Sequence, residues 1–148
     1  QSIASPGSFS ADPLARSRIE LLAMEAVAAA ERAMGFSPRD VSAEKCGWDI
    51  TSAVPPTGDT LPDDRLIEVK GRAKGATTIT LTKNEIIAAL NKPDQFWLAI
   101  VLVNEDDSTE GPYYLQGPVS QAPDWAEVSK NLELAELLAR ATRHGAGV

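Results

Sequence analysis

Residues 96–103 read FWLAIVLV, a run of apolar residues between Gln95 and Asn104. A short run without alternation of apolar and polar positions is typical of a strand that is covered on both faces. Such strands lie at the centre of layered α/β folds, where helices pack on the faces of a sheet. The segment therefore predicts a central sheet flanked by helices, and its neighbours are interpreted around it.

Two helices are predicted before this strand. Thr82 and Glu85 have the spacing of a capping box, so a helix is expected to start there and to end at Pro93. An earlier helix is expected from Asp12, which a proline follows, to Gly35, because these residues suit an N-cap, a first turn and a C-cap. Its buried stripe is predicted to consist of Leu21, Met24, Val27, Ala28 and Met34.

The remaining segments predict strands and a last helix. Strands are expected at 39–54 (two, with a turn near Cys46-Gly47), 65–71 (RLIEVKG), 76–82 (ATTITLT) and 113–119, and a helix at 131–143. We expect RLIEVKG and ATTITLT to pair as a hairpin, because they are consecutive β-rich segments. The predicted order is α-β-β-β-β-α-β-β-α, a mixed α/β fold.

The composition indicates one globular domain. The chain has 148 residues, 43% of them hydrophobic and 24% charged. Residues 1–11 are interpreted as a flexible lead-in and residues 12–148 as a single domain, and the start at Gln1 without Met suggests a fragment of a larger protein. Cys46 is the single cysteine, which favours a reducing, cytoplasmic location. No apolar run approaches the ~20 residues that span a bilayer, so no membrane partner is expected.

The charge balance bears on nucleic-acid binding. The chain holds 14 Lys and Arg against 21 Asp and Glu, a net charge of −7. This balance argues against a free-standing domain that holds nucleic acid by general attraction. Residues 94–148 hold 3 basic and 9 acidic residues, so the negative charge is concentrated there and the earlier part is nearly neutral.

Three residues on neighbouring predicted strands suggest a metal site. Glu68 and Lys70 point to the same face of their strand, because side chains alternate, and Asp49 lies on the preceding strand. Adjacent carboxylates repel unless a divalent cation joins them, and oxygen ligands suit Mg²⁺ or Mn²⁺. The predicted metal ligands are Asp49, Glu68 and the backbone carbonyl of Val69.

The same set suits phosphodiester hydrolysis. A bound ion would polarise the phosphate and acidify a water, and Lys70 would position or deprotonate that water and offset negative charge. The basic residues Arg72, Lys74 and Lys83 could contact neighbouring phosphates. A Glu-x-Lys strand alone usually lies on a solvated face, and Asp49 is what favours a catalytic interpretation.

Five segments together resemble a known family: AMEAVAAAERAMGF (23–36), GWDI (47–50), RLIEVKG, LTKNEI (81–86) and FWLAIVLV. Their order and spacing resemble the domain at the C-terminus of the plant protein NO VEIN, a domain that in prokaryotes is fused to helicase-like and other ATPase proteins. That family is similar to the PD-(D/E)XK, or restriction-endonuclease-like, superfamily, especially its Mrr-type branch. The resemblance implies a restriction-endonuclease-like core with Asp49, Glu68 and Lys70 as the active-site set.

The family's first helix often supplies a glutamate to the metal site. Glu25 and Glu31 are both candidates, and Glu31 is favoured because it falls on the predicted buried stripe, where an unpaired carboxylate would be costly. The family motif also includes Thr82-x-Asn84-Glu85. A capping box accounts for Thr82 and Glu85, whereas Asn84 is predicted to reach the site or the DNA.

The favoured hypothesis is a Mg²⁺-dependent DNA endonuclease domain of a larger defence, restriction-type or helicase-associated protein, in which an attached ATPase, helicase or recognition domain supplies affinity. The alternative is a nuclease-fold module that binds DNA or a partner protein without cutting. The intact Asp49, Glu68 and Lys70 favour cutting, and the net charge of −7 favours the alternative. DNA or RNA preference, recognition sequence, cleavage pattern and homodimer formation stay open.

Overall fold

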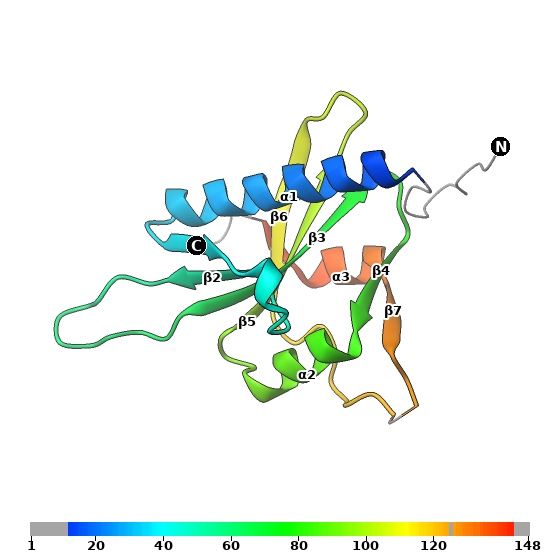
Figure 1. The fold of residues 1–148 in the computed structure, drawn as a ribbon. Coiled ribbons are helices and arrows are strands. Elements are labelled where there is room, and N and C mark those ends of the chain that lie inside the picture. Colours follow the sequence, from blue (N-terminus) through cyan, green and yellow to red (C-terminus); the bar gives the residue numbers. More distant parts are fainter. Residues whose placement is uncertain (1–11, 125, 144–148) are drawn as a thin grey trace.

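The computed structural model describes residues 12–124 and 126–143 (Figure 1), and the predicted lead-in at residues 1–11 lies outside them. The helices of the described residues are α1 (Pro13–Ala33), α2 (Lys83–Asn91) and α3 (Leu134–Arg140), with a short 3-10 helix, η1 (Ser42–Glu44). Their strands are β1 (Ser37–Asp40), β2 (Ile50–Ala53), β3 (Arg65–Ala73), β4 (Thr78–Thr82), β5 (Phe96–Val103), β6 (Thr109–Leu115), β7 (Ser129–Glu133) and β8 (Thr142–Arg143).

The segment FWLAIVLV forms β5, inside a six-stranded sheet with the order β1-β2-β3-β5-β6-β8. It pairs in parallel with β3, from Leu66 opposite Phe96 to Ala73 opposite Val103, and antiparallel with β6. Every residue of β5 except Trp97 is buried. The predicted α/β fold, a mixed sheet with helices on its faces, is confirmed.

Helix α1 lies across one face of this sheet (Figure 1). Its predicted N-terminal end is confirmed, and its C-cap is Met34, one residue before the predicted Gly35. The Asp12 side chain accepts a 3.0 Å hydrogen bond from the N–H of Leu14, and the helix starts at Pro13. Gly35 follows the last turn with φ of 91°, a left-handed conformation that glycine adopts without a steric cost.

The predicted buried stripe of α1 is confirmed at Val27 and wrong at Leu21. Leu21 is 59% exposed, and the buried residues of the helix are Ala23, Val27, Ala30 and Glu31. A Cβ on Gly71 of β3 would lie only 2.7 Å from the Cβ of Ala23, so the helix approaches the sheet through small residues. The large apolar residue Leu21 is turned outward, whereas Met24 and Met34 pack at the border of the core.

The other face of the sheet is covered by α2, α3 and a two-stranded sheet of β4 and β7. Alternate residues of β5 pack against these elements. The resulting core consists of Ile79, Leu81, Ile86, Leu98, Ile100, Leu102, Leu115, Leu134 and Leu137. The segment RLIEVKG therefore has one face toward α1 and the other toward α2 and β4.

The predicted hairpin between RLIEVKG and ATTITLT is wrong. β3 stays in the main sheet beside β5 through Ala73, and β4 leaves it to pair antiparallel with β7, with Thr78 opposite Glu133. The predicted helix at 131–143 is therefore divided into β7, α3 and β8, because pairing with β4 keeps residues 129–133 extended. The strand predicted at 113–119 is β6, which begins and ends earlier, at Thr109–Leu115.

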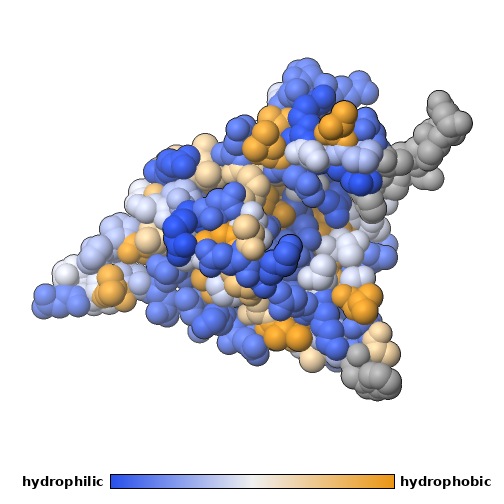
Figure 2. All heavy atoms as spheres, viewed as in Figure 1, coloured by the Kyte–Doolittle hydropathy of each residue, from blue (hydrophilic) through white to orange (hydrophobic). Residues whose placement is uncertain are grey.

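The surface in Figure 2 is mostly hydrophilic, with apolar residues scattered over it. Scattered apolar residues are normal for a globular domain. Among the described residues, no helix combines the length and the apolar character needed to cross a membrane.

Candidate functional site

β2 pairs with the first half of β3 and leaves the edge of its second half without a neighbouring strand among the described residues. β2 pairs with β3 only over Arg65 to Ile67, and the N–H of Asp49 donates to the Ile67 carbonyl at 2.8 Å. β3 continues to Ala73 with β5 on one side, and no strand of the described residues pairs with its other side there. The start of β2 therefore brings Asp49, the residue before it, to an open strand edge.

Asp49 is fixed to this edge through its side chain. Its Oδ2 accepts a 2.9 Å hydrogen bond from the N–H of Val69. The N–H and C=O of one strand residue point to the same side, so the Val69 carbonyl faces the open edge as well. The two oxygen groups predicted from Asp49 and Val69 therefore lie on one side of β3.

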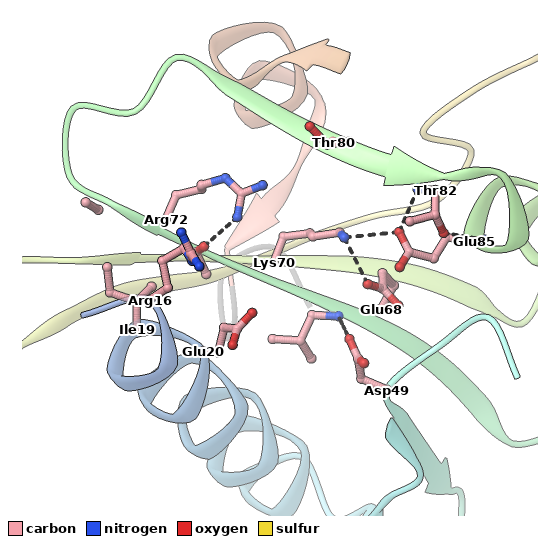
Figure 3. Close-up of a pocket in the computed structure, with 13 residues that line it drawn as sticks. Arg16, Ile19, Glu20, Asp49, Glu68, Lys70, Arg72, Thr80, Thr82 and Glu85 are labelled. Carbon is pink, nitrogen blue, oxygen red and sulfur yellow. Dashed lines mark hydrogen bonds and ion pairs between the residues drawn. The ribbon is translucent and has the colours of Figure 1, made fainter. Parts of the chain in front are cut away.

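Glu68 and Lys70 lie on the face of β3 toward α2 (Figure 3). The Lys70 Nζ is 3.2 Å from Glu68 Oε2 and 3.0 Å from Glu85 Oε1, which comes from the first turn of α2. The three side chains are between 5% and 16% exposed. Ion pairs with so little solvent contact are screened less by salt than surface pairs.

Burial governs the electrostatics of the site. It raises the pKa of Asp49, although hydrogen bonds from Val69 and Glu68 oppose the change. It also raises the pKa of Glu68 to about 10, against the attraction of Lys70. For Lys70 burial lowers the pKa, but the carboxyl groups of Glu68 and Glu85 outweigh it and the net direction is upward. Lys70 is therefore an ammonium ion at neutral pH and suits charge stabilisation better than proton removal.

A pocket of about 510 Å³ contains these groups. Asp49, Glu68 and Lys70 lie at one end, and Arg72 lies at the other (Figure 3). Arg72 donates from NH1 to the Gly71 carbonyl at 2.9 Å and from Nε to the Thr78 carbonyl at 3.3 Å, and burial lowers its pKa. The pocket thus has a carboxylate-rich end and an end that holds a guanidinium.

Glu31 is not at the pocket, contrary to the predicted metal role. It is fully buried, but Arg65 donates to both of its oxygens, at 2.8 and 3.0 Å, and the Tyr114 hydroxyl donates to Oε2 at 2.8 Å. The Arg65 guanidinium also lies over the rings of Phe36, Trp97 and Tyr114. Glu31 is therefore a structural group that links α1 to β3 and β6.

The other candidate on α1, Glu25, is exposed and does not line the pocket.

Three predicted DNA contacts also lie outside the pocket lining. Lys74 pairs with both oxygens of Glu110, at 2.6 and 2.8 Å, and Asn84 donates to the Lys45 carbonyl at 3.2 Å. Lys83 is the first residue of α2 and is not among the lining residues. Of the predicted phosphate contacts, only Arg72 reaches the pocket.

Sequence reasoning missed pocket residues on α1. Arg16 and Glu20 line the pocket, beside Ile19. They continue the stripe of Ala23 and Val27 toward the start of the helix, so a stripe centred on the alanines would have found them. Glu85 was interpreted as a cap alone, and no sequence pattern placed it beside Lys70.

The donor groups of this pocket fit magnesium. Mg²⁺ is commonly held by one or two carboxylates, several waters and substrate phosphates, and Asp49 and Glu68 supply two carboxylates. Burial raises the pKa of both, an unfavourable situation for the charged forms that a bound cation would offset. In the described part of the chain, no group of three or more His, Cys, Asp or Glu side chains is arranged to hold an ion. Water and substrate would have to complete the coordination.

The chain matches the sequence model of one protein family. The family described as "Protein NO VEIN, C-terminal" matches residues 19–115, more than half of the chain. The match includes Asp49, Glu68, Lys70 and Glu85. Searches of curated proteins and of solved structures gave no match.

Proposed function

The chain belongs to the family described as "Protein NO VEIN, C-terminal", and on that premise we propose that it is a metal-dependent endonuclease domain that hydrolyses phosphodiester bonds in DNA. One observation carries the proposal: two carboxyl groups and a lysine meet at an open strand edge inside a polar pocket. The set is the one that the PD-(D/E)XK resemblance implies, and residues far apart in the sequence form it.

A metal ion would be held by Asp49 and Glu68, with the Val69 carbonyl on the same edge. When bound, it would polarise the phosphate and lower the pKa of a coordinated water. Hydrolysis adds a water oxygen to phosphorus, breaks one P–O ester bond and leaves a proton on the departing oxygen. The Lys70 ammonium, close to Glu68, would offset the negative charge that grows on the phosphoryl oxygens.

Two arginines in the pocket lining, Arg16 and Arg72, support a substrate that carries phosphate groups, such as a nucleic acid. They line the end of the pocket away from Asp49 and Glu68, with Glu20 nearby, where a phosphate next to the reacting one would lie. Arginine suits phosphate because its planar guanidinium donates two parallel hydrogen bonds. With a chain charge of −7, the attachment of a DNA-binding or ATPase domain would supply the remaining affinity.

A second candidate is a module of the same fold that binds DNA or a partner without cutting. It is favoured by the lack of a three-ligand group among the described residues, and by the Lys70 ammonium already being paired with two carboxyl groups. The two candidates make different predictions for a metal-dependent assay.

The experiment is a cleavage assay on the full-length protein with linear and supercoiled DNA, both modified and unmodified, at low salt with ATP present. We expect nicking with Mg²⁺ or Mn²⁺, none with a chelator, and none from Glu68→Ala. Lack of nicking by the wild-type protein across all substrates, together with retained DNA binding, would favour the second candidate. Nicking that persists in Glu68→Ala would place the active site elsewhere.

A further inference from the structure

The first turn of α2 contacts the two segments that carry the candidate site residues, β3 with Lys70 and the loop that leads to Asp49. Glu85, the third residue of the helix, pairs with Lys70 at 3.0 Å. Asn84, one residue earlier, donates to the carbonyl of Lys45 at 3.2 Å, in the loop that leads to Asp49. One helical turn therefore touches the strand that carries Lys70 and the loop that carries Asp49.

The loop before Asp49 has little room to move against α2. Lys45 and Gly47 have φ of 55° and 103°, conformations that turn the chain sharply. A Cβ on Gly47 would lie 2.8 Å from the Cβ of Ala88 and 3.1 Å from the carbonyl oxygen of Asn84. The loop is thus packed directly on the helix, and the start of α2 is a fixed point relative to Asp49.

One carboxyl oxygen of Glu85, Oε1, takes part in both a hydrogen bond and an ion pair. Oε1 accepts a 3.0 Å hydrogen bond from the N–H of Thr82, the predicted capping box, and the same atom lies 3.0 Å from the Lys70 Nζ. A capping box works with glutamate or glutamine at this position. Helix capping therefore accounts for the first bond, but it does not require the negative charge that the second bond uses.

We propose that Glu85 is a positioning residue of the site, which holds the Lys70 ammonium against Glu68 and ties its location to α2 and thereby to Asp49. The role in catalysis rests on the proposed nuclease function. The structural part, that Glu85 orders the Lys70 ammonium, stands on the ion pair itself and is tested separately. Without Glu85, Lys70 would keep one partner and sample more rotamers of its long side chain.

Glu85→Gln is the decisive variant. Glutamine preserves the acceptor for Thr82, so Tm should stay close to that of the wild type, whereas the charge facing Lys70 is lost. The side-chain ammonium signal of Lys70, followed by NMR in isotope-labelled protein and assigned by its loss in Lys70→Arg, should exchange with water ~10-fold faster or disappear. The cleavage kcat should fall ~10-fold or more with little change in KM, because the group acts on the reacting centre and not on substrate affinity.

Ile86→Val is the matched control, because Ile86 is the next residue of α2, is buried in the core and does not line the pocket. It should lower the Tm modestly, because one buried methyl group is lost, but leave the Lys70 signal and kcat near wild-type values. If Glu85→Gln destabilises the chain unexpectedly, a Lys70 signal lost in Glu85→Gln and kept in Ile86→Val would still support the proposal.

The outcomes separate this proposal from the proposed function. An unchanged Lys70 signal in Glu85→Gln would overturn it, whether or not the chain cuts DNA. A lost signal with unchanged kcat would overturn the catalytic part. If the wild-type protein does not cut DNA, the proposed function fails, the catalytic part fails with it, and the Lys70 signal alone decides whether Glu85 orders the lysine.

Discussion

The Oδ2 atom of Asp49 accepts a 2.9 Å hydrogen bond from the N–H of Val69, which joins the segment before β2 to the strand that carries Glu68 and Lys70. The bond places one carboxyl group relative to the other without a metal. Asp49 directly precedes β2, and its backbone N–H still donates to the Ile67 carbonyl at 2.8 Å. The side-chain bond to Val69 adds a second contact farther along β3, so the geometry of the site depends on where β2 starts.

The first prediction concerns metal binding at Asp49. Asp49→Asn keeps an oxygen that can accept the Val69 hydrogen bond, so the fold should persist, but it removes a charged ligand. We expect Mn²⁺ binding, measured by calorimetric titration of the chain, to be lost. Asp59→Asn, at an exposed position, makes the same chemical change and should bind like the wild type. Equal heats in all three proteins would remove Asp49 from the metal site.

The second prediction concerns the pH dependence of stability. Burial raises the pKa of Glu68 from 4.5 to about 10, so the folded chain keeps a proton that the unfolded chain releases over this range. Stability from this group therefore falls as pH rises between these values. Glu68→Gln has no proton to lose, and its Tm should decline less than that of the wild type between pH 5 and 9, a range of about 4 pH units inside that window. Parallel Tm curves would contradict the raised pKa.

The third prediction concerns the buried Glu31–Arg65 pair. Arg65→Ala removes the cation from the fully buried Glu31 carboxylate and leaves it the Tyr114 hydroxyl, so the free energy of unfolding should fall by ~3–5 kcal/mol. Arg39→Ala breaks an exposed pair with Glu44 and should cost under ~1 kcal/mol. Denaturant unfolding measures both.

The fourth prediction uses a different variant, Tyr114→Phe, to separate a structural role of Glu31 from the predicted role at the metal site. Conservative Tyr114→Phe removes only the hydroxyl that donates to Glu31 and should keep the fold. We expect its Mn²⁺ binding to equal that of the wild type, because Glu31 does not line the pocket. Weaker Mn²⁺ binding in Tyr114→Phe would return Glu31 to the metal site.

The sequence predicted the parts of the fold that local chemistry decides. The ends of α1 follow from Asp12, Pro13 and Gly35, and the covered central strand follows from FWLAIVLV. The partner of β4 could not be predicted, because β7 is a short polar segment, SKNLE, whose extended form depends on pairing with Thr78–Thr82. Pairing between segments distant in the sequence leaves no local pattern.

Site residues that share one strand could be predicted from the sequence, whereas contacts between different helices and strands could not. Alternation placed Glu68 and Lys70 on one face, and the strand pairing brings Asp49 to the same edge. Glu31 was misplaced because burial on a helix stripe does not say which group a carboxylate meets, and Arg65 meets it from β3. Arg16 and Glu20 were missed because the predicted stripe began at Leu21 and did not include Ala23, which lies against Gly71.

The most direct test of the nuclease account is the cleavage rate of Lys70→Ala. The full-length wild type, Lys70→Ala and Lys92→Ala are compared on one supercoiled DNA with saturating Mg²⁺. Lys92→Ala removes the same charge at an exposed position outside the pocket lining. We expect Lys70→Ala to keep its fold and its Mn²⁺ binding but to cut ~100- to 10,000-fold more slowly, the loss typical of a charge-stabilising group. Lys92→Ala should cut at the wild-type rate. Equal rates for all three proteins would contradict the nuclease account.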